Sequence, residues 1–207
     1  MRRGFCLLKQ AGGASLILDS EERFVALRKT RTSKKKKKLG IVKYDLKHRR
    51  IYLVGEVVCG MPRLVENAIN LMQKKNSRAR IGVYLSSKGG LYPECLEIYQ
   101  IIWNSQTRID IIAVDKAFSG AFLILQAGKR RMAFPEAIMR FHKAEGMPDL
   151  ENTKIDAVQR LIFTARSRPV GKVLQLFHKE AEITAYDARR LRLIDQILDP
   201  KILKPLD

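Results

Sequence analysis

Residues 116–128 read Lys-Ala-Phe-Ser-Gly-Ala-Phe-Leu-Ile-Leu-Gln-Ala-Gly and place a serine and a glycine between two apolar segments. Before them, Ile109 to Val114 is a short β-branched run typical of a buried parallel strand. After them, Ala121 to Ala127 is apolar all round, which predicts a buried helix. Ser119 would begin that helix, where unpaired backbone N–H groups and the helix dipole favour developing negative charge. The position suits a nucleophile beside an oxyanion hole, although a serine in such a turn is more often only an N-cap.

The chain around this stretch alternates between strand and helix patterns. Such units predict right-handed crossovers and a mostly parallel sheet. We expect the folded domain to begin near Leu39. Its predicted strands are 50–58, 81–85, 109–114, 131–134 and 137–141, and residues 194–198 are expected to close the chain as a strand or an extended tail. Its predicted helices are 62–75, 92–104, 121–127, 153–166 and 170–178, with one more starting at Thr184.

Three local signals refine this pattern. Thr153 with Asp156, and Thr184 with Asp187, have the spacing of capping boxes, which predicts a helix start at each threonine. Trp103, the only tryptophan, is expected in the core with the inward side of the helix 92–104 (Leu96, Tyr99 and Ile102). Gly89-Gly90 directly follows a strand, and a glycine pair there lets a backbone approach a bound chain closely.

The net charge of +19 is concentrated near the N-terminus. Residues 1–50 hold 16 of the 40 Lys and Arg residues but only 4 of the 21 Asp and Glu residues. We therefore expect residues 1–38 to form a basic arm, with Lys34 to Lys38 as a self-repelling linker, and residues 39–207 to form one domain. The arm could bind a polyanion by counterion release. A solvated segment without a dedicated ligand is an equal alternative.

Composition argues against several classes of protein. Three cysteines without CxxC spacing favour reduced thiols, and three histidines without an HExxH pattern argue against a zinc site. We expect no metal and no cofactor. No apolar run reaches the length of a membrane span, and the apolar part of the N-terminus is too short for a secretory signal. These features favour a cytoplasmic location and no membrane contact.

Residues 43–198 resemble the proteolytic subunit of the Clp protease, a serine peptidase with a crotonase-like fold. Five ordered segments carry the likeness: 46–57 as the first core strand, 84–90 as a strand and Gly-Gly turn, 117–123 as the nucleophile segment with Gly128 at the family spacing, 131–142 as the histidine segment, and 183–195 as the C-terminal stretch. The resemblance implies an α/β, crotonase-like (Clp protease type) superhelix of repeated ββα units, here with a basic N-terminal extension.

The resemblance also implies a function. Ser119 takes the position of the nucleophile, His142 that of its general base and Glu180 that of the orienting aspartate, a role that glutamate fills in some triads. The backbone N–H groups of Gly90 and Gly120 take the positions of the oxyanion hole, and Gly89 and Gly90 contact the substrate. The implied protein is a serine endopeptidase that cleaves peptides or unfolded proteins in a homo-oligomeric ring, a heptamer or stacked heptamers, with a possible AAA+ unfoldase.

Some positions depart from the family pattern. Lys143-Ala144 replaces Gln-Pro after the histidine, Lys88 replaces the turn proline, and Asp115 stands where a glycine is usual. The stretch between His142 and Glu180 is short and lacks the family's glycine-rich strand. Two alternatives remain: a catalytically impaired structural ring subunit, and an acyl-CoA enzyme on the same fold, against which the serine and histidine segments argue.

Overall fold

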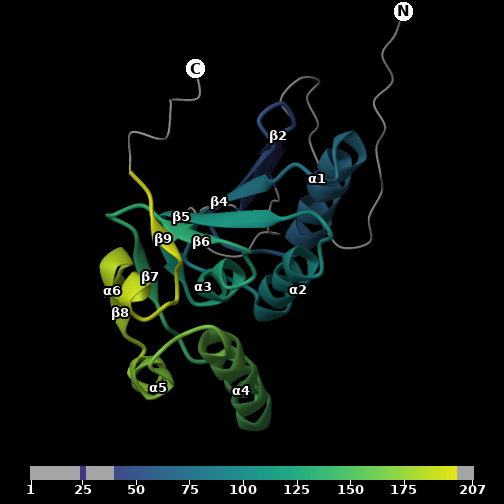
Figure 1. Cartoon of the computed structure of the whole chain (residues 1–207). Helices are drawn as coiled ribbons and strands as arrows, with labels where there is room; N and C mark the ends of the chain where they lie inside the picture. Colours follow the sequence, from purple (N-terminus) through teal and green to yellow (C-terminus); the bar gives the residue numbers. More distant parts are fainter. Residues whose placement is uncertain (1–23, 27–39, 200–207) are drawn as a thin grey trace, which may run out of the picture.

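The computed structural model describes residues 24–26 and 40–199, which form a sheet with helices (Figure 1). The strands are β1 (Phe24–Ala26), β2 (Ile41–Asp45), β3 (Arg50–Val54), β4 (Ile81–Ser87), β5 (Ile109–Phe118), β6 (Arg131–Ala133), β7 (Ile138–Arg140), β8 (Glu182–Thr184) and β9 (Gln196–Ile197). The helices are α1 (Met61–Lys75), α2 (Tyr92–Trp103), α3 (Gly120–Leu125), α4 (Asp149–Ala165), α5 (Val170–His178) and α6 (Ala185–Arg190).

The nine strands form one sheet whose order is β1-β2-β3-β4-β5-β6-β9. Neighbours from β3 through β9 pair in parallel, whereas β1, β2 and β3 pair antiparallel. β7 leaves this path, because it pairs in parallel with the far end of β5 and antiparallel with β8. The alternating strand and helix pattern and the parallel pairing confirm the predicted α/β fold class.

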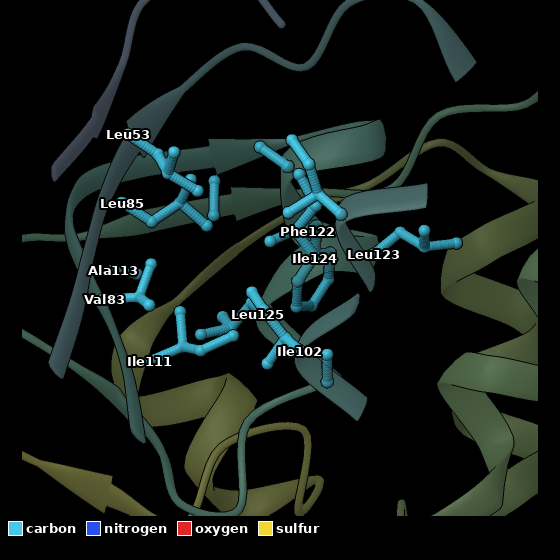
Figure 2. Close-up of a cluster of buried hydrophobic side chains, with 14 of the residues drawn as sticks. Leu53, Val83, Leu85, Ile102, Ile111, Ala113, Phe122, Leu123, Ile124 and Leu125 are labelled. Atoms are coloured by element: carbon cyan, nitrogen blue, oxygen red, sulfur yellow. The ribbon is translucent and has the colours of Figure 1, made fainter. Parts of the chain in front are cut away.

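The main core lies between the sheet and α1, α2 and α3. Every residue of α3 is buried. Figure 2 shows its side chains, including Phe122 and Leu125, packed against Leu85 and Ile111 of the sheet and Ile102 of α2. The ring of Phe122 also lies 5.0 Å from that of Phe141 and 4.8 Å from that of Phe163, so aromatic contacts join α3 to the strand end after β7 and to α4. The helix that follows Ser119 is therefore held on several sides.

Several boundaries differ from the sequence prediction. The strand expected over 50–58 ends at Val54, because Gly55 adopts φ 87° and turns the chain out of the sheet. β2 and β8 were not predicted. β2 depends on a tight turn in which Arg49 has φ 55°, a conformation that an arginine does not signal. β8 has only three residues and is defined by its pairing with β7.

Two local predictions were wrong. Trp103 is 45% exposed, because the buried face of α2 consists of Cys95, Ile98 and Ile102, and the indole stacks outside the core on Tyr99. The capping box at Thr153 does not exist. α4 begins at Asp149, four residues earlier, and the Thr153 hydroxyl donates to the Asp149 carbonyl inside the helix. The cap at Thr184 is confirmed, since its side chain accepts from the Asp187 N–H at 3.1 Å.

The proposed arm, residues 1–38, lies mostly outside the described residues. Phe24–Ala26 is the described part, and it pairs with residues 41–43 of β2. Lys34 to Lys38 lie outside the described residues, so the polyanion contact stays a prediction. No helix of the described ranges is long and apolar enough to cross a membrane.

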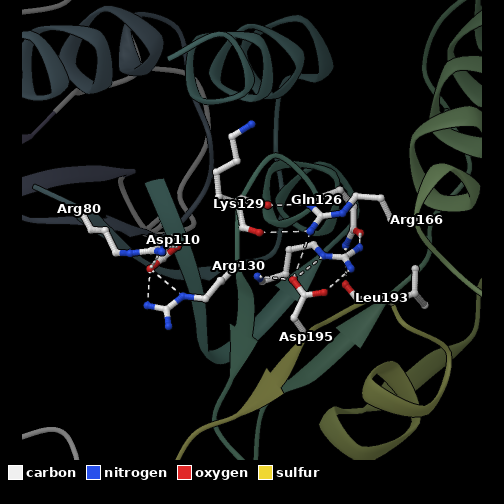
Figure 3. Close-up of polar contacts among 10 residues, drawn as sticks. Arg80, Asp110, Gln126, Lys129, Arg130, Arg166, Leu193 and Asp195 are labelled. Carbon is white, nitrogen blue, oxygen red and sulfur yellow. Dashed lines mark hydrogen bonds and ion pairs between the residues drawn. The ribbon is translucent and has the colours of Figure 1, made fainter. Parts of the chain in front are cut away.

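A charge network holds the C-terminal stretch against the sheet (Figure 3). The Arg131 side chain is 2% exposed, and it donates to both carboxylate oxygens of Asp195 and to the Gln126 side chain. The Arg166 guanidinium also reaches Asp195, at 3.4 Å. Burial raises the pKa of Asp195, but hydrogen bonds from Arg131 outweigh that effect and hold the pKa below its ordinary value. Asp195 is thus stabilised in its charged form.

Asp195→Asn should lower the free energy of unfolding at pH 7 by about 1–3 kcal/mol, because it leaves the buried Arg131 without its carboxylate, while water partly screens the 35% exposed Asp195 side chain. The unfolded carboxyl titrates near about pH 3.9, and the folded pKa is lower. The contribution of Asp195 is therefore present at neutral pH and lost as the pH falls below about 4. Denaturant unfolding of wild type and variant at pH 7 and at a pH well below the unfolded pKa of about 3.9 tests this prediction. Glu66→Gln, on the exposed side of α1, is the control. A stability difference independent of pH would contradict the assignment.

Candidate active site

Ser119 and His142 lie at the same edge of the sheet because β5 and β7 run in parallel. Residues 116–118 pair with residues 138–140, and the Ser119 N–H extends the pairing by donating to the Arg140 carbonyl at 2.9 Å. Both residues line a cavity of about 570 Å³, and Gly90 and Gly120 line it as well. The structure thus brings together four of the residues singled out in the sequence.

The backbone of Ser119 is strained. Its φ of 53° and ψ of −127° lie outside the ordinary regions for a residue with a side chain, a conformation that costs about 1–3 kcal/mol. Ser119 occupies the N-cap position of α3, yet its side chain makes no capping hydrogen bond. The N-cap role, the simpler alternative for this serine, therefore does not account for its hydroxyl.

The glycine pair after β4 lies against the serine. A Cβ atom on Gly89, which has φ 88°, would come within 2.8 Å of the Phe118 carbonyl and 2.9 Å of the Gly120 nitrogen. The next residue, Gly90, bridges to Val57, and Val57 bonds to the residues on either side of it, the Gly89 carbonyl and the Leu91 N–H. This bridge holds the Gly90 backbone along the cavity wall.

Gly120 leaves no room for a side chain. A Cβ there would overlap the Sγ of Cys95 and lie 2.8 Å from its Cβ. Burial raises the pKa of the Cys95 thiol to about 12, so the sulfur beside Gly120 stays neutral. As the first residue of α3, Gly120 has no carbonyl one turn earlier for its N–H, which leaves that donor for an oxyanion.

Glu180 lies next to His142 because β8 pairs antiparallel with β7. The register joins Arg140 to Glu182, and the Phe141 N–H donates to the Ala181 carbonyl, so the next pair along sets His142 opposite Glu180. A carboxylate oxygen of Glu180 lies 3.9 Å from His142 Nε2 and accepts the Lys143 N–H at 2.9 Å. Glu180 is thus near the imidazole, but its short hydrogen bond goes to the backbone.

Glu145, which sequence reasoning missed, is the nearer carboxylate. Its Oε1 lies 3.3 Å from the same ring nitrogen, Nε2 of His142. The loop that carries it is fixed by Asp156, whose carboxylate accepts the Ala144 N–H at 2.7 Å. The only sequence signal for Glu145 was its place three residues after His142. Two further carboxylates of this region have other contacts: that of Asp187 accepts the Thr184 hydroxyl at 3.0 Å, and that of Glu182 lies 3.8 Å from Arg140.

No hydrogen bond joins the Ser119 hydroxyl to His142 within the described ranges. In a serine triad, one ring nitrogen faces the serine and the other faces the acid. Here both glutamates approach Nε2, so a catalytic arrangement requires the imidazole to rotate. Such bonds are often long before substrate binds and tighten in the complex. Over the same residues, no group of three or more His, Cys, Asp or Glu side chains could hold a metal ion.

A family model described as Clp protease matches residues 33–201 of the chain. This range contains all the residues that line the cavity, from Lys88 to Gln159, together with β8 beside Glu180. It agrees with the resemblance found in the sequence.

Gly120→Ala should destabilise the protein by about 1–3 kcal/mol, because the new methyl group would overlap the buried Cys95 side chain. Gly171→Ala is a matched control, since Gly171 lies in the first turn of α5 with no atom within 4 Å of an added Cβ. That change should be neutral or raise stability by up to about 1 kcal/mol. Thermal unfolding of both variants measures the difference, and equal effects would show that Cys95 can move aside.

Proposed function

The chain belongs to the Clp protease family, and we propose that it is a serine endopeptidase that cleaves peptides or unfolded proteins through an acyl-enzyme on Ser119. Family membership supports a peptidase. The observation that carries the serine mechanism is the backbone of Ser119, which is strained and leaves the hydroxyl without a capping role at the wall of the cavity shared with His142. Strain of this kind is found where function requires it.

The proposed reaction uses groups already at the cavity. The imidazole of His142 takes the hydroxyl proton while Ser119 Oγ attacks the substrate carbonyl, and the carbonyl oxygen becomes an oxyanion. The backbone N–H groups of Gly90 and Gly120 donate to that oxyanion. His142 then gives its proton to the leaving amine, and the C–N bond breaks. Water, deprotonated by the same imidazole, hydrolyses the acyl-enzyme and restores Ser119.

Glu180 is the proposed orienting carboxylate. The β7–β8 register places it opposite His142, and its bond to the Lys143 N–H fixes the carboxylate beside the ring. Glu145 approaches the imidazole more closely, but its side chain is 78% exposed, so water screens its charge. Rotation of His142 toward Ser119 would direct its other ring nitrogen to Glu180.

The remaining parts of the proposal follow from the family. The active enzyme is a homo-oligomeric ring, a heptamer or stacked heptamers, in the cytoplasm, and a possible AAA+ unfoldase delivers substrates. Enclosure in a ring restricts which polypeptides reach the active site, because the hydrolysis reaction itself has little sequence selectivity. The alternative of a catalytically impaired ring subunit is favoured by one observation, the carboxylate of Glu145 at the ring nitrogen that would otherwise face the serine. The labelling experiment below decides between the two.

Ser119 should be the only serine that reacts with a fluorophosphonate probe, because within residues 40–199 it is the serine that shares a cavity with His142 and the backbone of Gly90 and Gly120. Intact-mass analysis should show one adduct on the assembled wild type and none on Ser119→Ala. Ser77→Ala, at an exposed turn, serves as the control and should label like the wild type. A wild-type protein that never labels would favour the structural subunit.

Glu180→Gln should slow labelling by up to about 10⁴-fold if the carboxylate orients His142 as a triad acid does, whereas Glu180→Asp should retain most of the rate. Glu145→Gln, the matched variant, should change the rate less than about tenfold, because an exposed charge pair contributes little. The measurement is the second-order labelling rate at equal oligomeric state. If Glu145→Gln were labelled more slowly than Glu180→Gln, Glu145 would be the orienting carboxylate.

A further inference from the structure

We propose that the active-site cleft selects peptides with acidic side chains beside the scissile bond, an inference that rests on the proposed peptidase function. Three cationic side chains line the cavity around Ser119: Lys88, Arg140 and Lys143. Glu145 is the one carboxylate among the described residues that line it, and it lies against His142 at 3.3 Å. The residues that line the cleft therefore carry a net positive charge. Two further carboxylates lie beside them, Glu180 at 3.9 Å from His142 Nε2 and Glu182 at 3.8 Å from Arg140.

The two lysines flank the nucleophile from opposite segments. Lys88 directly precedes the Gly89-Gly90 turn, and Lys143 directly follows His142. Both are exposed, and neither makes an ion pair within residues 40–199. A peptide bound between these segments would place its side chains within reach of one lysine or the other.

The backbone at each lysine is fixed. The Ser87 hydroxyl accepts the Gly89 N–H at 3.0 Å, which holds the turn that carries Lys88. The Lys143 N–H donates to Glu180 at 2.9 Å, which holds the start of the second segment. Because these anchors use no lysine side chain, both ammonium groups stay available to a ligand, and binding need not order the backbone that carries them.

Arg140 supplies the third cation and an unused donor. The backbone carbonyl of Arg140 accepts the Ser119 N–H. The Arg140 side chain therefore starts from a residue directly beside the nucleophile. Its Nε is buried and has no acceptor in the described part of the chain, and its Nη1 lies 3.8 Å from Glu182. A buried guanidinium N–H without a partner is costly, and a carboxylate is the acceptor that fits it best.

Internally quenched peptides that differ only in the residues beside the scissile bond test the proposal. Versions with Glu, Gln or Lys there should be cleaved by the assembled full-length protein in the order Glu, Gln, Lys. We expect kcat/KM to favour Glu over Gln by about tenfold at about 0.05 M salt, and the ratio to fall toward one near 0.5 M salt. Equal rates for the Glu and Gln peptides at low salt would overturn the proposal.

Substitutions assign the preference to the named cations. Lys88→Gln and Lys143→Gln should each reduce the ratio of Glu to Gln cleavage by about fivefold or less. Lys172→Gln, an exposed lysine on α5 that does not line this cavity, should leave the ratio unchanged. If neutral peptides are cleaved and neither cleft variant alters the ratio, the charge selection is wrong while the peptidase function stands.

A binding measurement tests the proposed selectivity even if the protein has no peptidase activity. Fluorescence anisotropy of the same peptides with Ser119→Ala reports binding without chemistry. Tighter binding of the Glu peptide, weakened by Lys143→Gln but not by Lys172→Gln, would support the cleft's selectivity even if the peptidase proposal failed. Equal affinity for the Glu and Gln peptides would overturn it.

Discussion

The parallel pairing of β5 with β7 determines where Ser119 and His142 lie. It sets residues 116–118 beside residues 138–140, and the Ser119 N–H continues the pairing to the Arg140 carbonyl. One residue further, the Phe141 N–H donates to Ala181, so β8 is tied to the same strand. Three distant segments are thus joined within a few hydrogen bonds. The serine, the histidine and the glutamate arrive at one edge because of backbone pairing, before any side chain interacts.

Close backbone packing keeps this edge in place. Gly89 lies against Phe118 and Gly120, and Gly120 lies against Cys95, so the turn after β4 packs directly on the serine segment, and this segment packs on the Cys95 side chain of α2. Behind them, Phe122 packs on Phe141 and Phe163. A core packed this closely resists small displacements. It can therefore hold Ser119 in a backbone conformation that an isolated chain would leave.

The charges around the cleft have two different roles. Glu145 and Glu180 both approach Nε2 of His142, at 3.3 and 3.9 Å. Lys88, Lys143 and Arg140 line the cavity around the serine; the two lysines make no ion pair within residues 40–199, whereas Arg140 lies 3.8 Å from Glu182. By contrast, the buried Arg131 is fully engaged with Asp195 and Gln126. The buried Arg131 is thus paired more fully than the cations that line the cavity.

Local sequence patterns predicted the fold class, most of the helices and the segments that carry Ser119, Gly89-Gly90 and His142, because apolar periodicity and glycine placement are local properties. Features that arise from pairing between distant segments became visible in the folded chain alone. The β7–β8 register brought Glu180 to His142, and the loop held by Asp156 brought Glu145 closer still. The prediction for Trp103 was wrong for a related reason. The sequence gives the angular position of Trp103 around α2, but the packing of α2 against the rest of the fold determines which face of the helix is buried. Local sequence patterns identify candidate residues, and long-range backbone hydrogen bonds determine which of these residues lie close together.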